Sequence, residues 1–290
     1  MTALIAPAEL LTLLAQHPIV IDVRSPDTGD ARAAYNRGHV PGAHFADFWH
    51  DLVAVDRRDT APGSAPLPPP DQLQNTLRRW GVHGDETIIT VSDRPFWAAR
   101  AWFVLRAAGL VDVRVLDGGW QRWVADGHPV SSDPPPPREG TVTVEATSRQ
   151  VIDASRAATL ADDGVLFDAR DPRFYRGEDP GVAPGPAGHI PGARNVPASA
   201  LYAPDGTMQP AALLRELFAR LGVVDHTSVG VYCGAGISAT ALALAVNEAG
   251  HSAEVYVGSW SDWVNDPTRP VATTGDAASP TATAPSTVTS

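Results

Sequence analysis

The chain has 290 residues with a formal net charge of −11 at neutral pH, and 43% of its residues are hydrophobic. This acidic excess argues against nucleic acid or an anionic membrane as the main partner, because both are negatively charged. The single cysteine excludes an internal disulfide, which is typical of a reducing compartment. The first residues lack the basic start and cleavage site of a signal peptide, and no apolar stretch reaches about 18 residues. We therefore expect a soluble cytoplasmic protein.

Short apolar, β-branched runs alternate with helical patterns along the chain. The runs predict buried strands, and the 3.6-residue patterns predict helices. Apolar strands that alternate with helices predict an α/β fold with a mostly parallel sheet covered by helices on both faces. Ligands of such sheets bind beyond the carboxyl ends of the strands. The predicted strands are 19–23, 88–91, 113–116, 165–168, 228–232 and 253–257, and the predicted helices are 71–80, 97–108, 210–221 and 238–249.

The order of short motifs in the first half of the chain recurs in the second half. Matched landmarks in one order predict a tandem duplication, and halves of about 130 residues suit one domain each. We expect one domain over residues 1–130 and another over 142–273. The matched motifs are Asp-x-Arg at 22–24 and 168–170, "GHVPGA" at 38–43 and "GHIPGA" at 188–193, and "VRVLDGGWQRW" at 113–123 and "AEVYVGSWSDW" at 253–263.

Two segments fall outside this repeat. Residues 131–141 begin with "SSDPPPPREG", and such a proline-rich, polar composition predicts an extended, semi-rigid linker. Residues 274–290 are small and polar with almost no apolar anchor, so we expect a disordered tail.

The only cysteine, Cys233, lies in "VYCGAGISAT" at a predicted strand-to-helix turn. Glycines let such a loop curl tightly, so that its N–H groups converge on one point, where the following helix adds partial positive charge. The Ser238 hydroxyl could cap that helix or donate to the sulfur. These features favour a nucleophilic thiolate, and equally a negatively charged persulfide. The candidate loop residues are Gly234, Ala235, Gly236, Ile237 and Ser238.

The alternative interpretation of Cys233 is a buried cysteine beside a turn that serves packing. The first half of the chain argues against it. Ser92 falls opposite Cys233 there, in "SDRPFW", and the glycines are missing. Glycines needed only for packing should persist in both copies. The difference indicates one active half and one supporting half.

The tandem Asp-x-Arg and GH(V/I)PGA motifs, the single cysteine loop and the paired Gly-x-Trp segments resemble the two-domain rhodanese-like sulfurtransferases. The resemblance covers about Leu4 to Val271. It implies two tandem rhodanese-like domains, the first inactive and the second catalytic. Cys233 would take a sulfur atom from 3-mercaptopyruvate or thiosulfate as a persulfide and pass it to cyanide, a small thiol or thioredoxin. No metal or organic cofactor is implied.

The loop sequence bears on the choice of donor. "CGAG" is similar to the Cys-Gly-(Ser/Ala)-Gly pattern of 3-mercaptopyruvate sulfurtransferases, whereas thiosulfate-preferring members carry basic residues after the cysteine. Gly234 and Ala235 occupy those positions here. Thiosulfate is a dianion and gains more from a nearby cation than mercaptopyruvate does. The loop therefore favours mercaptopyruvate, with thiosulfate as the alternative.

The resemblance also assigns substrate anion binding to the arginine of an Arg-Phe pair, which is Arg173. A guanidinium can hold a carboxylate through two hydrogen bonds, whereas the alternative is a solvated surface arginine. A second arginine, often found nine residues further on, is replaced by Val182. Arg176 or the first-domain residue Arg94 could substitute for it.

Other polar residues are expected to be structural. A serine–histidine–aspartate relay is not assigned, because the loop position is Ala235 and residues 52–70 contain no histidine; His50 is the nearest one. The remaining histidines show no metal-ligand spacing. Residues shared by both halves favour structural roles: Asp22 and Asp168, His39 and His189, and Trp120 and Trp260.

Two other functions remain open. Cysteine phosphatases and arsenate reductases use a similar loop, but their anion-binding arginine would fall at Ala239. A non-catalytic binding module would normally lose the cysteine, as the first half has. We also expect the first domain to contribute side chains to the pocket, because sites of the resembled family lie between the domains.

Overall fold

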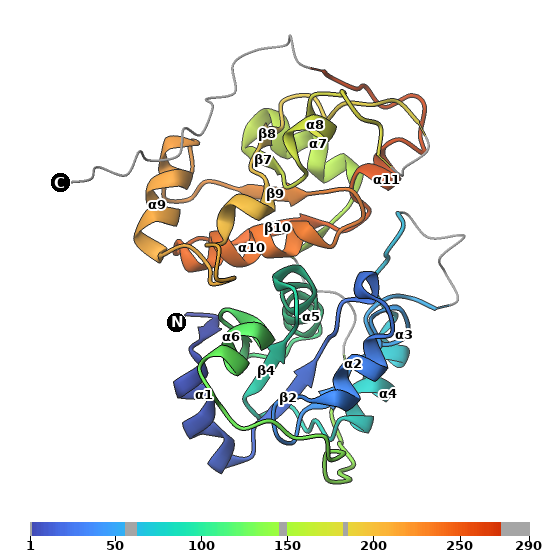
Figure 1. Ribbon diagram of the computed structural model, residues 1–290. Coiled ribbons are helices and arrows are strands. Elements are labelled where there is room, and N and C mark those ends of the chain that lie inside the picture. Colours follow the sequence, from blue (N-terminus) through green and yellow to red (C-terminus); the bar gives the residue numbers. More distant parts are fainter. Residues whose placement is uncertain (1, 56–62, 145–149, 182–184, 274–290) are drawn as a thin grey trace, which may run out of the picture.

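Two parallel β-sheets form the centre of the structure, which is a computed structural model describing residues 2–55, 63–144, 150–181 and 185–273 (Figure 1). Within these residues each half of the chain contributes five strands, in the orders β1-β5-β4-β2-β3 and β6-β10-β9-β7-β8. The identical order confirms the predicted α/β fold with two tandem units. Residues 274–290, the predicted tail, lie outside the described residues, and the predicted domain boundaries stay a prediction.

The first unit follows the predicted alternation of strands and helices. Its long strands match the predicted ranges to within one residue. Two-residue strands, a one-turn helix and seven-residue helices were not predicted, because segments this short show little periodicity. Helices α4 and α5 begin at prolines, which suit a first helical turn because they have no N–H to satisfy. The elements are β1 (Leu4–Ile5), α1 (Pro7–Leu13), β2 (Ile19–Asp22), α2 (Ala31–Arg37), β3 (His44–Phe45), α3 (Phe48–Asp51), α4 (Pro70–Arg79), β4 (Ile88–Val91), α5 (Pro95–Ala107), β5 (Val113–Leu116) and α6 (Gly119–Ala125).

The second unit repeats the plan. Its three four-residue strands and two of its helices again fall on the predicted segments. The ten-residue helix over 154–163 and several shorter strands and helices were not predicted. The elements are β6 (Val151–Ile152), α7 (Ala154–Asp163), β7 (Val165–Asp168), α8 (Pro172–Tyr175), β8 (Arg194–Asn195), a 3₁₀ turn (Ala198–Leu201), α9 (Ala211–Arg220), β9 (Val229–Tyr232), α10 (Ser238–Glu248), β10 (Ala253–Tyr256) and α11 (Ser259–Trp263).

Alternation along each strand divides the apolar side chains between the two faces of the sheet. In β2, Ile19 and Ile21 join the core that contains α3, α4 and α5, whereas Val20 joins the core that contains α1, α2 and α6. In β9, Val229 and Val231 face α9 and α10, whereas Tyr232 faces α7 and α11. The period of two therefore fixes which side chains point toward the other domain.

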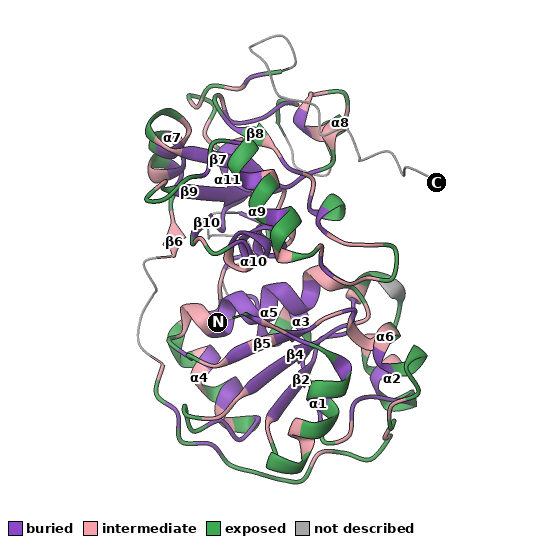
Figure 2. Ribbon diagram, turned by 90° about the vertical axis from the view of Figure 1, so that its left-hand side faces the viewer, coloured by how far each residue is buried: buried purple, intermediate pink, exposed green. Residues whose placement is uncertain are grey.

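Helices α5 and α10 pack against each other between the two sheets, and both are buried along most of their length (Figures 1 and 2). The inner cores of the two domains merge there into one hydrophobic cluster. A continuous core of this kind holds the two domains in one relative orientation, because separating them would expose both helices to water.

The connecting segment after the first domain lies along that domain's surface (Figure 2). Ser131 pairs with His39 through two backbone hydrogen bonds, and Gly140 donates its N–H to the Arg78 carbonyl at 2.9 Å. Gly140 has no room for a side chain, since a Cβ atom would lie 2.2 Å from the Val82 carbonyl oxygen. The proline-rich segment is therefore attached at both ends.

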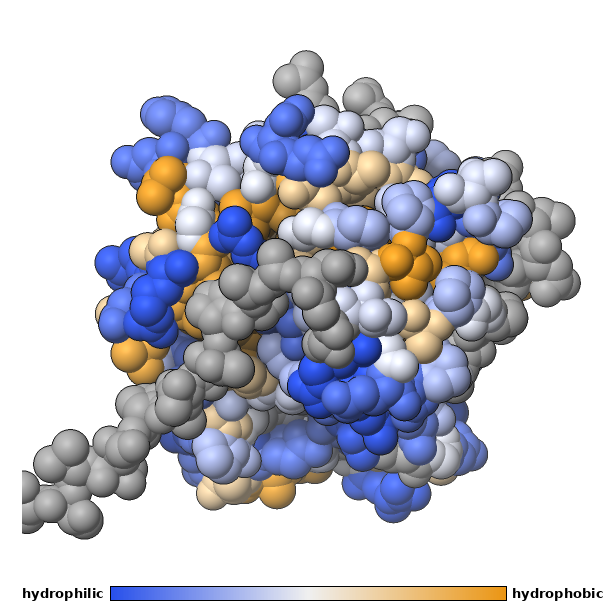
Figure 3. Space-filling model, turned by 90° about the horizontal axis from the view of Figure 1, so that it is seen from above, coloured by the Kyte–Doolittle hydropathy of each residue, from blue (hydrophilic) through white to orange (hydrophobic). Residues whose placement is uncertain are grey.

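The outer face of the second domain, seen from above, carries hydrophilic side chains with hydrophobic ones scattered among them (Figure 3). None of the helices in the described ranges combines the length and the apolar character needed to cross a bilayer.

Candidate active site

The two Asp-x-Arg motifs form the same buried ion pair. In the first domain Arg24 donates to both carboxylate oxygens of Asp22, at 2.6 and 2.9 Å, and its guanidinium lies 4.4 Å from the ring centre of Trp120. In the second domain Arg170 binds Asp168 at 2.6 Å and lies 4.5 Å from the ring centre of Trp260. Each arginine also donates to the carbonyl of the glycine that opens the GH(V/I)PGA motif, Gly38 or Gly188.

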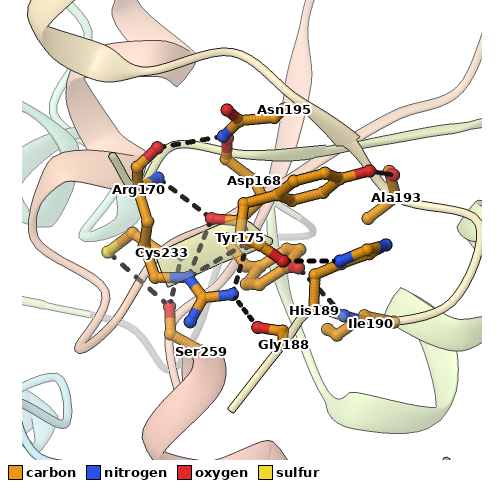
Figure 4. A network of polar contacts seen from close by, with 11 residues as sticks. Asp168, Arg170, Tyr175, Gly188, His189, Ile190, Ala193, Asn195, Cys233 and Ser259 are labelled. Carbon is orange, nitrogen blue, oxygen red and sulfur yellow. Dashed lines mark hydrogen bonds and ion pairs between the residues drawn. The ribbon is translucent and has the colours of Figure 1, made fainter. Parts of the chain in front are cut away.

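The motif histidines are equally duplicated. His39 stacks on Tyr35 with ring centres 3.9 Å apart, and its Nδ1 lies 3.0 Å from the Tyr35 carbonyl oxygen. His189 stacks on Tyr175 at 3.7 Å with the matching contact at 2.7 Å (Figure 4). Contacts that recur in both domains support the structural roles predicted for these residues, since only one domain carries the cysteine.

Cys233 follows directly after β9, at the carboxyl end of the sheet. The alternation of β9 directs its side chain to the inner face, toward the helices between the domains, and its exposed fraction is 2%. The neighbouring strand β7 connects outward to β8, whereas β9 lies on the other side of β7. Cys233 thus lies beside the point where the strand order reverses, which is where open α/β sheets bind ligands.

The loop after Cys233 aims a backbone donor at the sulfur. The Gly236 N–H donates to the Cys233 Sγ at 3.1 Å. Gly236 has φ +75°, a conformation that favours glycine, and a Cβ there would lie 2.3 Å from the Val257 carbonyl oxygen. The carbonyl groups of the loop accept hydrogen bonds from α11. The N–H of Trp260 donates to the Cys233 carbonyl, and the N–H of Ser261 donates to the Gly234 carbonyl, each at 2.9 Å. This arrangement is one that favours a negative charge on sulfur.

Ser238 does not play the part predicted for its hydroxyl. It is the first residue of α10, and the residue at the cap position is Ile237, which offers no side-chain hydrogen bond. Because the chain already has helical angles at Ile237, Ser238 lies too far into the helix to cap it. The predicted cap is therefore wrong, although the eleven-residue helix does begin at this loop.

The hydroxyl beside the sulfur comes from Ser259. Its Oγ accepts the Cys233 N–H at 3.1 Å, donates to the Tyr256 carbonyl at 2.9 Å and lies 3.9 Å from the Cys233 Sγ (Figure 4). Ser259 has φ +56°, close to the +59° of its counterpart Gly119. The sequence held a signal for this residue, since "GGW" in the first half reads "GSW" in the second.

One first-domain side chain reaches the loop. Arg100 of α5 is fully buried and donates from Nη1 to the Gly236 carbonyl at 3.0 Å. A first-domain side chain that the motif comparison did not single out thus contacts the cysteine loop, whereas the expected contribution to a substrate pocket stays a prediction. Its signal in the sequence was an arginine within an otherwise apolar helical pattern, "PFWAARAWFV".

The structure places Arg173 near the start of α8, with a side chain that is 58% exposed. It makes long ion pairs with Asp171 at 3.9 Å and Asp179 at 3.8 Å, which leave it accessible to a substrate anion. Its role in donor binding stays a prediction. Val182, the position of the missing second arginine, lies outside the described residues.

The other candidate cations have partners or lie elsewhere. Arg176 is held by the Glu178 carboxylate at 2.6 and 2.8 Å. Arg94 belongs to the first domain's own loop, where its backbone N–H donates to Ser92. His50 has a side chain that is 66% exposed. Across the described ranges, His, Cys, Asp and Glu side chains form no cluster of three or more that could hold a metal ion.

Known proteins share this architecture. The sequence model of the rhodanese-like domain family matches residues 6–126 and again residues 153–266. SseB of Mycobacterium tuberculosis, whose name proposes a thiosulfate sulfurtransferase, is 40% identical over 280 residues, covering 92% of this chain and 96% of SseB. A Pseudomonas aeruginosa protein whose name proposes a 3-mercaptopyruvate sulfurtransferase is 37% identical, with 88% and 92% covered.

Solved structures agree on the fold. The crystal structure of YnjE superimposes with a TM-score of 0.82 at 28% identity, covering 93% of this chain and 68% of that one. A persulfide-bearing variant of EanB with ergothioneine gives a TM-score of 0.80 at 24% identity, covering 93% and 70%. From the two family matches and the similarity over nearly the whole chain, this protein is a member of the rhodanese-like sulfurtransferase family, with two tandem rhodanese-like domains.

Proposed function

We propose that Cys233 is the nucleophile of this sulfurtransferase and carries the transferred sulfur as a persulfide. The observation that carries the proposal is the Gly236 N–H directed at the Cys233 Sγ, in a loop at the carboxyl end of β9. The first domain has Ser92 at the equivalent position. The Ser92 carbonyl accepts the N–H of Trp120, just as the Cys233 carbonyl accepts the N–H of Trp260. Sulfur transfer is accordingly assigned to the second domain.

The donor favoured here is 3-mercaptopyruvate. The Cys233 thiolate attacks its sulfur, an S–S bond forms, the carbon–sulfur bond breaks, and pyruvate leaves as its enolate and takes up a proton. An acceptor such as cyanide, a small thiol or thioredoxin then attacks the outer sulfur and releases the thiolate. The loop offers no charged side chain at Gly234 or Ala235, which suits a monoanionic donor better than the thiosulfate dianion. The lone cysteine favours a cytoplasmic location.

Intact mass spectrometry of the reduced protein tests the persulfide. We expect 3-mercaptopyruvate to add one sulfur atom, cyanide to remove it, and thiosulfate to react more slowly. Because Cys233 is the only cysteine, Cys233→Ser is a complete control and should gain nothing. No added sulfur from either donor would contradict the proposal and favour a non-catalytic binding module.

Arg173→Ala is expected to raise the KM for mercaptopyruvate about tenfold with a smaller change in kcat, since a charged hydrogen bond to the donor carboxylate contributes about 1.5–3 kcal/mol. Steady-state kinetics with cyanide as acceptor measure this. Arg220→Ala is the matched control, because Arg220 is a similarly exposed arginine paired with Glu216 on α9. Unchanged donor kinetics in Arg173→Ala would remove Arg173 from the site.

A further inference from the structure

Arg100 is a charged residue inside the hydrophobic contact between the two domains. It lies in the middle of α5, whose neighbouring residues are apolar, and its exposed fraction is 0%. Its Nη1 donates to the Gly236 carbonyl at 3.0 Å and its Nη2 donates to the Ala65 carbonyl at 2.8 Å, whereas its Nε has no hydrogen-bond partner. The guanidinium therefore bridges a first-domain segment and the cysteine loop of the second domain.

The charge of Arg100 is not balanced by a carboxylate anywhere in the described ranges. A buried charge without a counter-charge is costly, because neutral carbonyls replace only part of its hydration. Burial lowers the pKa of Arg100 to about 10, and a negative charge on Cys233 opposes this shift. The guanidinium is therefore still charged at neutral pH, and the anion whose charge acts on it is the sulfur.

The other charged groups around Cys233 are already paired. Asp168 at the end of β7 and Arg170, two residues later, neutralise each other. On α11, Asp262 accepts the Tyr256 hydroxyl and lies 3.5 Å from Arg269. Residues 63–66 and the first turn of α10 carry no charged side chain, and Arg173 on α8 is mostly exposed and near two carboxylates. Among the described residues, Arg100 is therefore a buried positive charge near the Cys233 sulfur that no carboxylate pairs with.

Arg100 also restrains Gly236, whose N–H donates a hydrogen bond to the Cys233 sulfur. Gly236 is bounded on one side by the Val257 carbonyl and is held on the other by the Arg100 guanidinium. Its own N–H is the group that donates to the Cys233 Sγ. Holding the Gly236 carbonyl therefore restrains the orientation of the neighbouring N–H.

We infer that Arg100 is a positioning residue through which the first domain completes the sulfur site: it restrains Gly236 and supplies the buried positive charge that balances the Cys233 thiolate and its persulfide. The persulfide part rests on the proposed function. Ser92 aligns with Cys233, so Arg100, eight residues on, aligns with Ala241 of α10. The first half, which lacks the cysteine, therefore supplies the cation, and the second half, which has the cysteine, carries an alanine at the matching position.

Alkylation of Cys233 by iodoacetamide at a series of pH values tests the charge, and it needs no sulfur donor. We expect Arg100→Met and Arg100→Gln to shift the midpoint of the rate–pH profile upward by about one unit, with a roughly tenfold slower reaction at pH 7. Gln keeps a donor for the Gly236 carbonyl, so it separates the loss of charge from the loss of the hydrogen bond. Arg106→Gln is the matched control, because Arg106 lies on the same helix with partial exposure.

A merely structural role would lower the melting temperature of the Arg100 variants without moving the midpoint, and that result in a folded variant overturns the inference. The wild-type protein gives a second measurement that is free of folding problems. Because the charge is buried, its midpoint should move by less than about 0.3 units between about 0.05 and 0.5 M salt. A larger rise with salt would assign the effect to an exposed cation and also overturn the inference. Persulfide formation from the donor, assayed separately in wild type, tests the proposed function itself.

Discussion

Gly236→Ala is expected to slow the formation of the Cys233 persulfide about 100-fold or more, since removing one preorganised backbone donor from an anion site typically costs 10²–10³ in rate. The substitution strains the loop in two ways. Its φ of +75° costs a residue with a Cβ about 1–2 kcal/mol. The added Cβ would also lie 2.3 Å from the Val257 carbonyl oxygen, which is backbone and cannot rotate away. The loop must shift, and the N–H that donates to the sulfur shifts with it.

Gly234→Ala is the matched control for this prediction. Gly234 lies in the same loop, but a Cβ there meets no atom within 4 Å and its φ is outside the left-handed region. We expect a loss of at most a few-fold. Single-turnover measurement of added sulfur by mass, with both variants at equal concentration, compares them directly. Equal rates for the two alanine variants would show that the Gly236 contact with the Cys233 Sγ is unimportant.

Asp168→Ala is expected to lower the free energy of unfolding by about 3–5 kcal/mol, because it leaves a buried guanidinium without its partner. Asp168 is fully buried, and the Arg170 side chain is only 8% exposed. Arg170 would keep its hydrogen bond to the Gly188 carbonyl, which is neutral and cannot replace the carboxylate. Urea denaturation followed by circular dichroism measures the loss.

The first domain supplies a replicate of this experiment. Asp22→Ala removes the same ion pair from Arg24, so it should cost a similar amount even though the cysteine loop is in the other domain. Glu216→Ala, which breaks an exposed pair on α9, should cost about 0.5 kcal/mol or less. A large loss of activity in Asp168→Ala with wild-type stability would contradict the structural role of the motif.

The duplication has produced two different contributions to one site. The framework of Asp-x-Arg, histidine on tyrosine and arginine on tryptophan is the same in both halves. What differs lies at the contact between the domains, where the second half keeps Cys233 and the first half presents Arg100 from α5. The merged core holds these two groups in register, because α5 and α10 cannot separate without exposing apolar surface.

Much of the fold could be predicted from local patterns in the sequence. The short apolar run at 228–232 was enough to predict a strand that ends just before Cys233, because buried strands of parallel sheets are nearly continuous apolar runs. The repeated motifs predicted two similar domains, and "CGAG" predicted a loop that requires glycine, as the φ of Gly236 bears out. These features depend on neighbouring residues, so they can be recognised without knowing the rest of the fold.

Only the tertiary structure decided which side chains meet at the sulfur. Ser238, five residues from Cys233, was expected to help and does not cap α10, whereas Ser259 is 26 residues away and lies 3.9 Å from the Sγ. Arg100 is 136 residues from Gly236, which it binds. Such contacts depend on how α5 packs on α10 and how α11 follows β10. Packing between elements leaves no periodic signal in the sequence, and an arginine becomes a buried counter-charge only when a second domain covers it.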